Sequence, residues 1–123
     1  MEVYTDNWIN VKIINNYHSN TFEIPTEIEL NDIKNGYSVK ISNGLERFWV
    51  SVIDIKEYYI IGKVDNKLVH NNNYDYGSFV MFEKDNIYDI HDLEFKKMML
   101  RYASNKRKVT NNKKSKKNKI KNN

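Results

Sequence analysis

The chain of 123 residues contains no cysteine, one proline and one alanine. Without cysteine, disulfide bonds and thiolate nucleophiles are excluded. No apolar run approaches the roughly 20 residues that a membrane-spanning helix requires. The first residues, MEVYTD, lack the basic region and apolar run of a signal peptide. We therefore expect an intracellular, non-secreted protein without a transmembrane segment.

Acidic residues are missing from the end of the chain, and this absence divides the charge in two. All 16 acidic residues precede residue 105, together with 11 of the 20 basic ones, so that residues 1–104 carry a net charge of −5. The other nine basic residues give the last segment a net charge of +9. They are Lys106, Arg107, Lys108, Lys113, Lys114, Lys116, Lys117, Lys119 and Lys121.

Patterns that carry catalysis or hold cofactors are also missing. His18, His70 and His91 lie far apart in sequence and match no metal-ligand spacing. The four glycines form no phosphate-binding loop, and no G-x-S-x-G nucleophile motif occurs. We therefore expect no enzyme activity, no catalytic residues, no metal site and no cofactor.

Apolar residues alternate with polar ones along much of the chain, which is typical of half-buried strands. The alternation predicts a strand over residues 9–13, paired with an extended piece over 21–24, and a short helical turn over 26–33 from a capping box at Thr26. Five strands are expected between residues 37 and 90, joined by tight turns such as Asn43-Gly44. Their alternation predicts one buried face, formed by Val39, Ile41, Phe48, Val50, Val52, Val80 and Phe82.

The period changes from two to about 3.6 residues after Asp92, a good N-cap. Phe95, Met98 or Met99, and Tyr102 then recur at helical spacing. Residues 105–123 hold too few apolar side chains to offset the entropy of ordering, so we expect them to be disordered.

The predicted fold is mostly β, of the α+β class. A small SH3-like barrel of about five short antiparallel strands curls upon itself and conceals its edges. Its parts are an N-terminal hairpin with a helical turn over residues 1–35, the β-barrel over 36–91, an amphipathic helix over 92–104 and a lysine-rich tail over 105–123.

Several short sequence patterns lie in the predicted barrel. They are GYSVKI at 36–41, ERFWVSV at 46–52, GKVDN at 62–66, YGSFVMF at 76–82 and IYDI at 87–90. Through these patterns, residues 36–90 resemble a family of small uncharacterised domains of bacteria and large DNA viruses. The resemblance implies the fold and, since the family has no assigned activity, no mechanism. The abundance of Asn, Lys, Ile and Tyr, which have AT-rich codons, also suits a large DNA virus.

The alternation that buries Phe48 places Trp49 on the outer face of the sheet. One interpretation is that the C-terminal helix or the N-terminal hairpin covers this side chain. The alternative is an aromatic face, formed by Trp49 with Tyr58, Tyr59 or Tyr76, that binds a protein partner.

The basic tail suggests the function. A dense polycation binds the phosphate backbone of DNA or RNA by counterion release, without sequence preference. The sequence therefore predicts a non-enzymatic accessory protein that binds nucleic acid through the nine basic residues, as a virion or genome-associated component in a virus. The alternatives are a nuclear localisation signal at 113–117, attraction to an anionic membrane, and a solubilising role beside a protein-interaction module.

Overall fold

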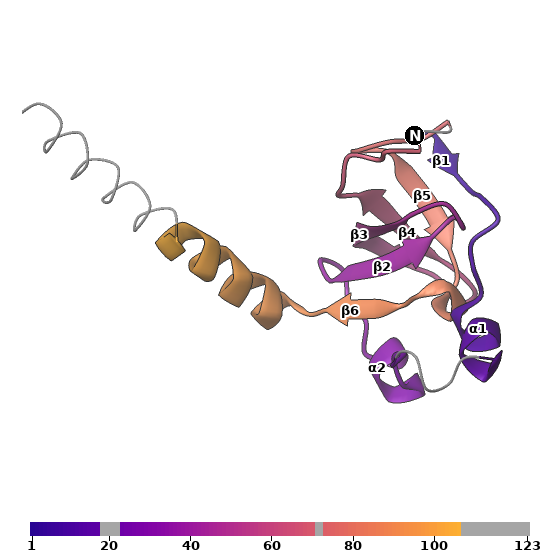
Figure 1. The fold of residues 1–123 in the computed structure, drawn as a ribbon, viewed down its shortest axis with the longest axis horizontal. Coiled ribbons are helices and arrows are strands. Elements are labelled where there is room, and N and C mark those ends of the chain that lie inside the picture. The colour runs from indigo at the N-terminus through magenta and orange to yellow at the C-terminus, as the bar shows by residue number, and fades with distance from the viewer. Residues whose placement is uncertain (18–22, 71–72, 107–123) are drawn as a thin grey trace, which may run out of the picture. The chain divides into compact units, whose positions relative to one another are not determined.

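The computed structural model describes residues 1–17, 23–70 and 73–106, which form two compact units (Figure 1). The first unit is Met1–Asp92, and the second begins at Leu93. The expected extended piece at 21–24 falls partly outside the described residues. Of the expected tail, residues 107–123 lie outside them, so its disorder stays a prediction.

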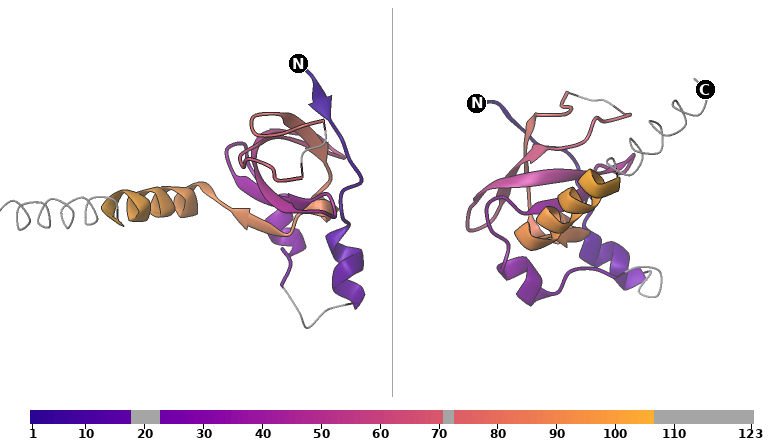
Figure 2. Two further views of the ribbon diagram at one scale, coloured as in Figure 1. Left: turned by 45° about the horizontal axis from the view of Figure 1, so that its top comes forward. Right: turned by 90° about the vertical axis from the view of Figure 1, so that its left-hand side faces the viewer.

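Six strands make up a single mixed sheet in the first unit, in the order β1-β5-β4-β3-β2-β6. The β1–β5 pair is parallel and the other pairs are antiparallel. The sheet is strongly curled in the left view of Figure 2. Among the described residues no pair joins β1 to β6, so the fold shown is a small, curled, mostly β sheet. The strands are β1 (Val3–Tyr4), β2 (Ser38–Ser42), β3 (Arg47–Ile55), β4 (Ile60–Val64), β5 (Phe79–Phe82) and β6 (Asp89–His91).

The predicted buried face forms the core of this sheet. Phe48, Val50 and Val52 of β3 are each at most 2% exposed, and the predicted residues of β2 and β5 are equally buried. The five strands expected between residues 37 and 90 correspond to β2–β6, whereas the two-residue strand β1 was not predicted. In β2 and β3 the apolar residues occupy one face, because side chains in a strand alternate with a period of two. The Asn43-Gly44 turn is confirmed as well: Gly44 has a φ of 92°, and the Asn43 side-chain oxygen accepts the backbone N–H groups of Leu45 and Glu46.

Gly62 of β4 lies opposite an irregularity in the neighbouring strand β3. The β3–β4 register shifts between Val52 and Asp54, opposite this glycine. A Cβ atom at Gly62 would lie 3.1 Å from the Ser51 carbonyl oxygen, 3.1 Å from Val50 Cγ2 and 3.2 Å from Phe82 Cε1. The close backbone approach, with a bulge in the facing strand, explains a glycine within a run of strand formers.

Gly62→Ala is expected to lower the free energy of unfolding by about 1 kcal/mol or more, because an extra methyl group in a well-packed core forces the neighbouring atoms to move. Where the backbone tolerates alanine, replacing glycine by alanine normally raises the free energy of unfolding by a few tenths of a kcal/mol or more. A decrease would therefore show that the added methyl group is too close to its neighbours. Denaturant unfolding measures it, with Lys63→Ala at the exposed neighbouring position as the control. A Gly62→Ala variant more stable than the parent would contradict the close approach.

The N-terminal hairpin predicted for residues 9–13 and 21–24 is wrong. The segment instead forms the helix α1 (Val11–Tyr17), which follows the short strand β1. Asn10 begins the helix by accepting the Ile13 N–H on its side-chain oxygen. Only Val11 is buried, whereas a strand would have buried Ile13 too, and Ile13 is 53% exposed.

The short helix predicted from the capping box is confirmed as α2 (Glu27–Asn31), whose N-cap Thr26 exchanges hydrogen bonds with Glu29. Lys12 of α1 forms ion pairs with Glu27 of α2 and, at 3.0 Å, with Asp85 of the 3₁₀ helix η1 (Lys84–Asn86). These carboxylates raise the pKa of Lys12, Glu27 contributing most. The ion pairs therefore connect the two N-terminal helices to the end of β5.

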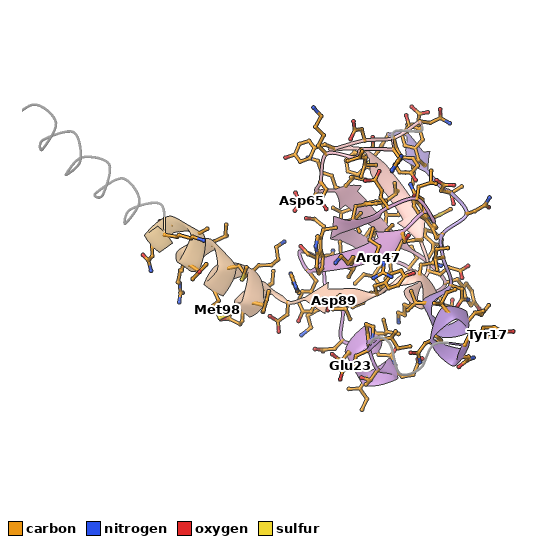
Figure 3. The ribbon with its side chains drawn as sticks, in the orientation of Figure 1. Tyr17, Glu23, Arg47, Asp65, Asp89 and Met98 are labelled. Carbon is orange, nitrogen blue, oxygen red and sulfur yellow. The ribbon has the colours of Figure 1, made fainter. Side chains whose placement is uncertain are left out.

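The second unit contains the predicted C-terminal helix, which covers residues 93–106. Met98, labelled in Figure 3, lies on this helix with Met99 and Tyr102, and all three side chains are exposed. Lys97, Arg101 and Lys106 are exposed too. The helix therefore presents both apolar and basic side chains.

Candidate functional site

A hollow of about 450 Å³ opens on the surface of the first unit. Three segments far apart in the sequence line it. They are residues 5–8 between β1 and α1, Tyr58 and Tyr59 in the turn between β3 and β4, and residues 81–83 with Asn86 at the end of β5. We call this site the aromatic hollow, because Trp8, Tyr58, Tyr59 and Phe82 all line it.

Trp8 is held firmly in the aromatic hollow. Its indole Nε1–H donates to the Met81 carbonyl oxygen at 2.7 Å, and its ring packs against Phe48 and Tyr74 with centroids 6.0 and 5.7 Å away. The next residue, Ile9, donates its backbone N–H to the Ser42 carbonyl oxygen at 2.9 Å. A tryptophan that packs apolar surface and pairs its N–H gives the hollow a rigid wall.

Two carboxylates line the aromatic hollow, on Asp6 and Glu83, and no lysine, arginine or histidine does. Asp6 accepts the Tyr74 hydroxyl at 2.6 Å and the Asn7 backbone N–H at 2.7 Å, which fix its position. Within the described part of the chain, neither carboxylate forms a salt bridge. The hollow therefore has an uncompensated negative charge.

The two tyrosines form the exposed rim of the hollow. The turn that carries them is closed by the Lys56 backbone N–H, which donates to the Tyr59 carbonyl oxygen at 2.9 Å. Tyr58 is 79% exposed, whereas Tyr59 is about half as exposed. The rim is thus available to a ligand while its backbone is fixed.

Trp49 lies elsewhere. Its ring stacks on His91 of β6, with centroids 4.0 Å apart, and the Lys40 ammonium group lies 5.3 Å from its centroid. Trp49 is six residues from the end of β3 that leads to the two tyrosines, a span of about 20 Å. The structure therefore brings Tyr58 and Tyr59 together with Trp8, and places Trp49 and the exposed Tyr76 outside the aromatic hollow. Trp8 was not predicted as a site residue, because the segments that surround it are distant in the sequence.

Glu46 and Arg47, the charged part of the ERFWV pattern, have separate partners. Glu46 accepts the backbone N–H groups of Val69 and His70 at 3.1 and 2.8 Å and so fixes these two residues after β4. The Arg47 guanidinium, labelled in Figure 3, lies 4.3 Å from the centroid of the Tyr88 ring. Both side chains therefore have structural roles in the sheet.

The loop before β5 is organised by Asp75. Its carboxylate accepts the backbone N–H groups of Leu68 and Tyr76, at 2.8 and 2.7 Å. These hydrogen bonds lower the pKa of Asp75 below its usual value, Leu68 contributing most. The adjacent residue, Tyr74, is buried and packs against Trp8, so Asp75 indirectly supports the wall of the hollow.

Asp75→Ala is expected to destabilise the protein at neutral pH and to leave its stability less sensitive to acid. A carboxyl group whose pKa is lowered by folding stabilises the folded state at every pH above its pKa in the unfolded chain, which is near 3.8. This stabilisation is lost as the pH falls through the lower pKa of the folded state. Thermal unfolding between neutral pH and acid measures the effect, with the exposed Asp65→Ala as the control. Parallel pH profiles for Asp75→Ala and the parent protein would contradict it.

The basic residues predicted to bind nucleic acid belong to the second unit. Lys106 is described and lies over the Tyr102 ring, with 6.0 Å between its ammonium and the ring centroid. Arg107 and the seven lysines after it lie outside the described residues. Lys97, 3.6 Å from Glu94, and Arg101 add two exposed cations that the sequence prediction did not include.

Within residues 1–17, 23–70 and 73–106, no helix has the length and apolar character needed to cross a membrane. Over the same residues, no three side chains of His, Cys, Asp or Glu gather as a metal site would require.

In comparisons with known proteins, no family model, no curated protein and no solved structure matches the chain. The charge distribution and the geometry of the first unit therefore remain as the indications of function.

Proposed function

We propose that the protein is a non-enzymatic accessory protein that binds DNA or RNA without sequence preference through the basic residues of its second unit. The reversal of charge at the boundary between the two units carries this proposal. Residues 1–92 contain eight basic and fifteen acidic residues, a net charge of −7. Residues 93–123 contain twelve basic residues and one acid, a net charge of +11.

The proposed partner is the phosphate backbone, because duplex DNA carries one negative charge for about every 1.7 Å of its axis. Each phosphate that a lysine or arginine neutralises releases condensed counterions, which drives binding regardless of base sequence. Residues 107–123 contain no aromatic side chain, so stacking on bases contributes nothing there. Exposed Lys97, Arg101 and Lys106 extend the basic surface onto the helix.

The first unit has a different part in this proposal. Its negative charge repels nucleic acid. In this proposal the first unit is therefore the part that is carried on the nucleic acid or that docks onto another component, while the second unit binds the nucleic acid. We further infer that residues 36–91 form an SH3-like barrel, which the curling of the sheet and the tight Asn43-Gly44 turn support. Composition supports a virion or genome-associated component of a large DNA virus, with nuclear import through residues 113–117 as a further role of the same lysines.

A second candidate function is a protein-interaction module. The observation in its favour is the aromatic hollow, where Tyr58 and Tyr59 of the predicted partner-binding face lie beside Trp8. Trp49 can contribute to such a module only as a separate surface, because its ring stacks on His91.

Affinity purification of the tagged protein, with and without nuclease treatment of the lysate, separates the two functions. For a nucleic-acid-binding protein, we expect nucleic acid to be recovered and most co-purifying proteins to be lost after nuclease treatment. A set of partners that nuclease leaves unchanged would contradict the first function and favour the second.

A further inference from the structure

The aromatic hollow combines two features that recognise a cation. The faces of aromatic rings carry partial negative charge and attract ammonium and guanidinium groups, and Trp does so most strongly among the aromatic side chains. Trp8, Tyr58 and Tyr59 supply three such rings, and Asp6 and Glu83 add two carboxylates without a lysine, arginine or histidine among the lining residues.

The shape of the site fits a peptide better than a small ion. A second hollow of about 220 Å³ adjoins the first and shares Tyr58, Tyr59 and Glu83 with it. Its two lysines are directed to other partners: Lys56 pairs with Asp54 at 3.1 Å, and Lys84 donates to the Asn31 side-chain oxygen at 3.1 Å. A ligand can thus place one side chain in each hollow while its backbone crosses the tyrosine rim.

We propose that the aromatic hollow binds an arginine- or lysine-bearing peptide segment of a partner protein. The basic side chain lies against Trp8 and Tyr58 with its charge toward Asp6 and Glu83, and a neighbouring side chain occupies the adjoining hollow. The net charge of −7 on residues 1–92 attracts such a segment before contact. This site is independent of nucleic-acid binding by residues 93–123.

The two tryptophans provide a direct test in the full-length protein. The probe is the peptide acetyl-Gly-Leu-Arg-Gly-Leu-Arg-Gly-amide, titrated into ¹⁵N-labelled protein, with the two indole Nε1–H resonances as reporters. We expect the resonance of Trp8, whose N–H donates to Met81, to shift saturably while that of Trp49 stays in place. The same peptide with citrulline in place of arginine keeps the shape without the charge, and should bind about fivefold more weakly or worse.

Matched variants locate the site. Tyr58→Ala removes an exposed rim residue and should weaken binding about two- to fivefold, the range of one exposed cation–π contact. Tyr76→Ala removes another exposed tyrosine, which lies outside the hollow, and should leave the affinity unchanged. Glu83→Gln should weaken binding, and the exposed Asp65→Asn should not.

Three results would overturn the proposal. Equal binding of the arginine and citrulline peptides would show that charge is not recognised. Equal effects of Tyr58→Ala and Tyr76→Ala, or a shift of Trp49 equal to that of Trp8, would place the peptide elsewhere. A shift of the Trp8 resonance on changing Lys113, Lys114, Lys116 and Lys117 to Gln, without peptide, would identify the lysine-rich segment of the chain itself as the occupant.

Discussion

Replacing Phe48 with alanine is expected to lower the free energy of unfolding by about 3–5 kcal/mol, the usual result of removing a buried aromatic ring. Phe48 is 1% exposed and packs against Trp8 and Tyr74, so its loss leaves a cavity between the sheet and the wall of the aromatic hollow. Domains of this size have a total stability of about 5–15 kcal/mol, so the variant should unfold at a much lower denaturant concentration or fail to fold.

Urea unfolding followed by tryptophan fluorescence measures the effect, and Tyr17→Ala is the control. Tyr17 is the last residue of α1 and is 80% exposed, so its replacement should change stability by about 0.5 kcal/mol or less. A soluble Phe48→Ala protein with an unchanged unfolding midpoint would contradict the assignment of the buried face.

Changing Lys113, Lys114, Lys116 and Lys117 to glutamine is expected to weaken binding to duplex DNA by about three to four orders of magnitude near 0.1 M salt. Each phosphate contact contributes close to a factor of ten there through counterion release, and four cations are lost. Fluorescence anisotropy of a labelled random-sequence duplex measures the affinity. The fold should be unaffected, because none of the four lysines belongs to the first unit.

The control removes the same number of charges from the first unit, at the exposed Lys34, Lys56, Lys63 and Lys67. Both variants have a formal net charge of zero, since the parent chain carries +4. If total charge governed binding, the two variants would lose equal affinity. The proposal instead predicts that the control binds nearly as tightly as the parent, and equal losses would contradict it.

The strands β2 and β3 could be predicted because their large apolar side chains share one buried face. Val39, Ile41, Phe48, Val50 and Val52 alternate with polar or exposed residues, and only one register buries them all. Residues 9–14 were ambiguous. Their isoleucines and valine fit both a strand and one face of a helix, and the deciding interaction, the Asn10 cap on Ile13, is local and easily overlooked.

The aromatic hollow could not be predicted, because its parts come together only through the pairing of distant strands. Trp8 reaches Met81 by a hydrogen bond across 73 residues, and Tyr58 and Tyr59 arrive from another turn. The sequence grouped these tyrosines with Trp49 by residue type, whereas the length of β3 separates them. The net charge of a segment follows directly from its residues, so the basic segment could be recognised from the sequence alone.

The salt dependence of binding by the unmodified protein tests nucleic-acid recognition most directly. The logarithm of the affinity for duplex DNA should fall linearly with the logarithm of the salt concentration, with a slope of about −0.9 for each phosphate neutralised and about −4 to −8 in total. Two duplexes of unrelated sequence should give the same slope and similar affinities. A shallow slope, or a strong preference for one sequence that persists at high salt, would contradict binding through the phosphate backbone.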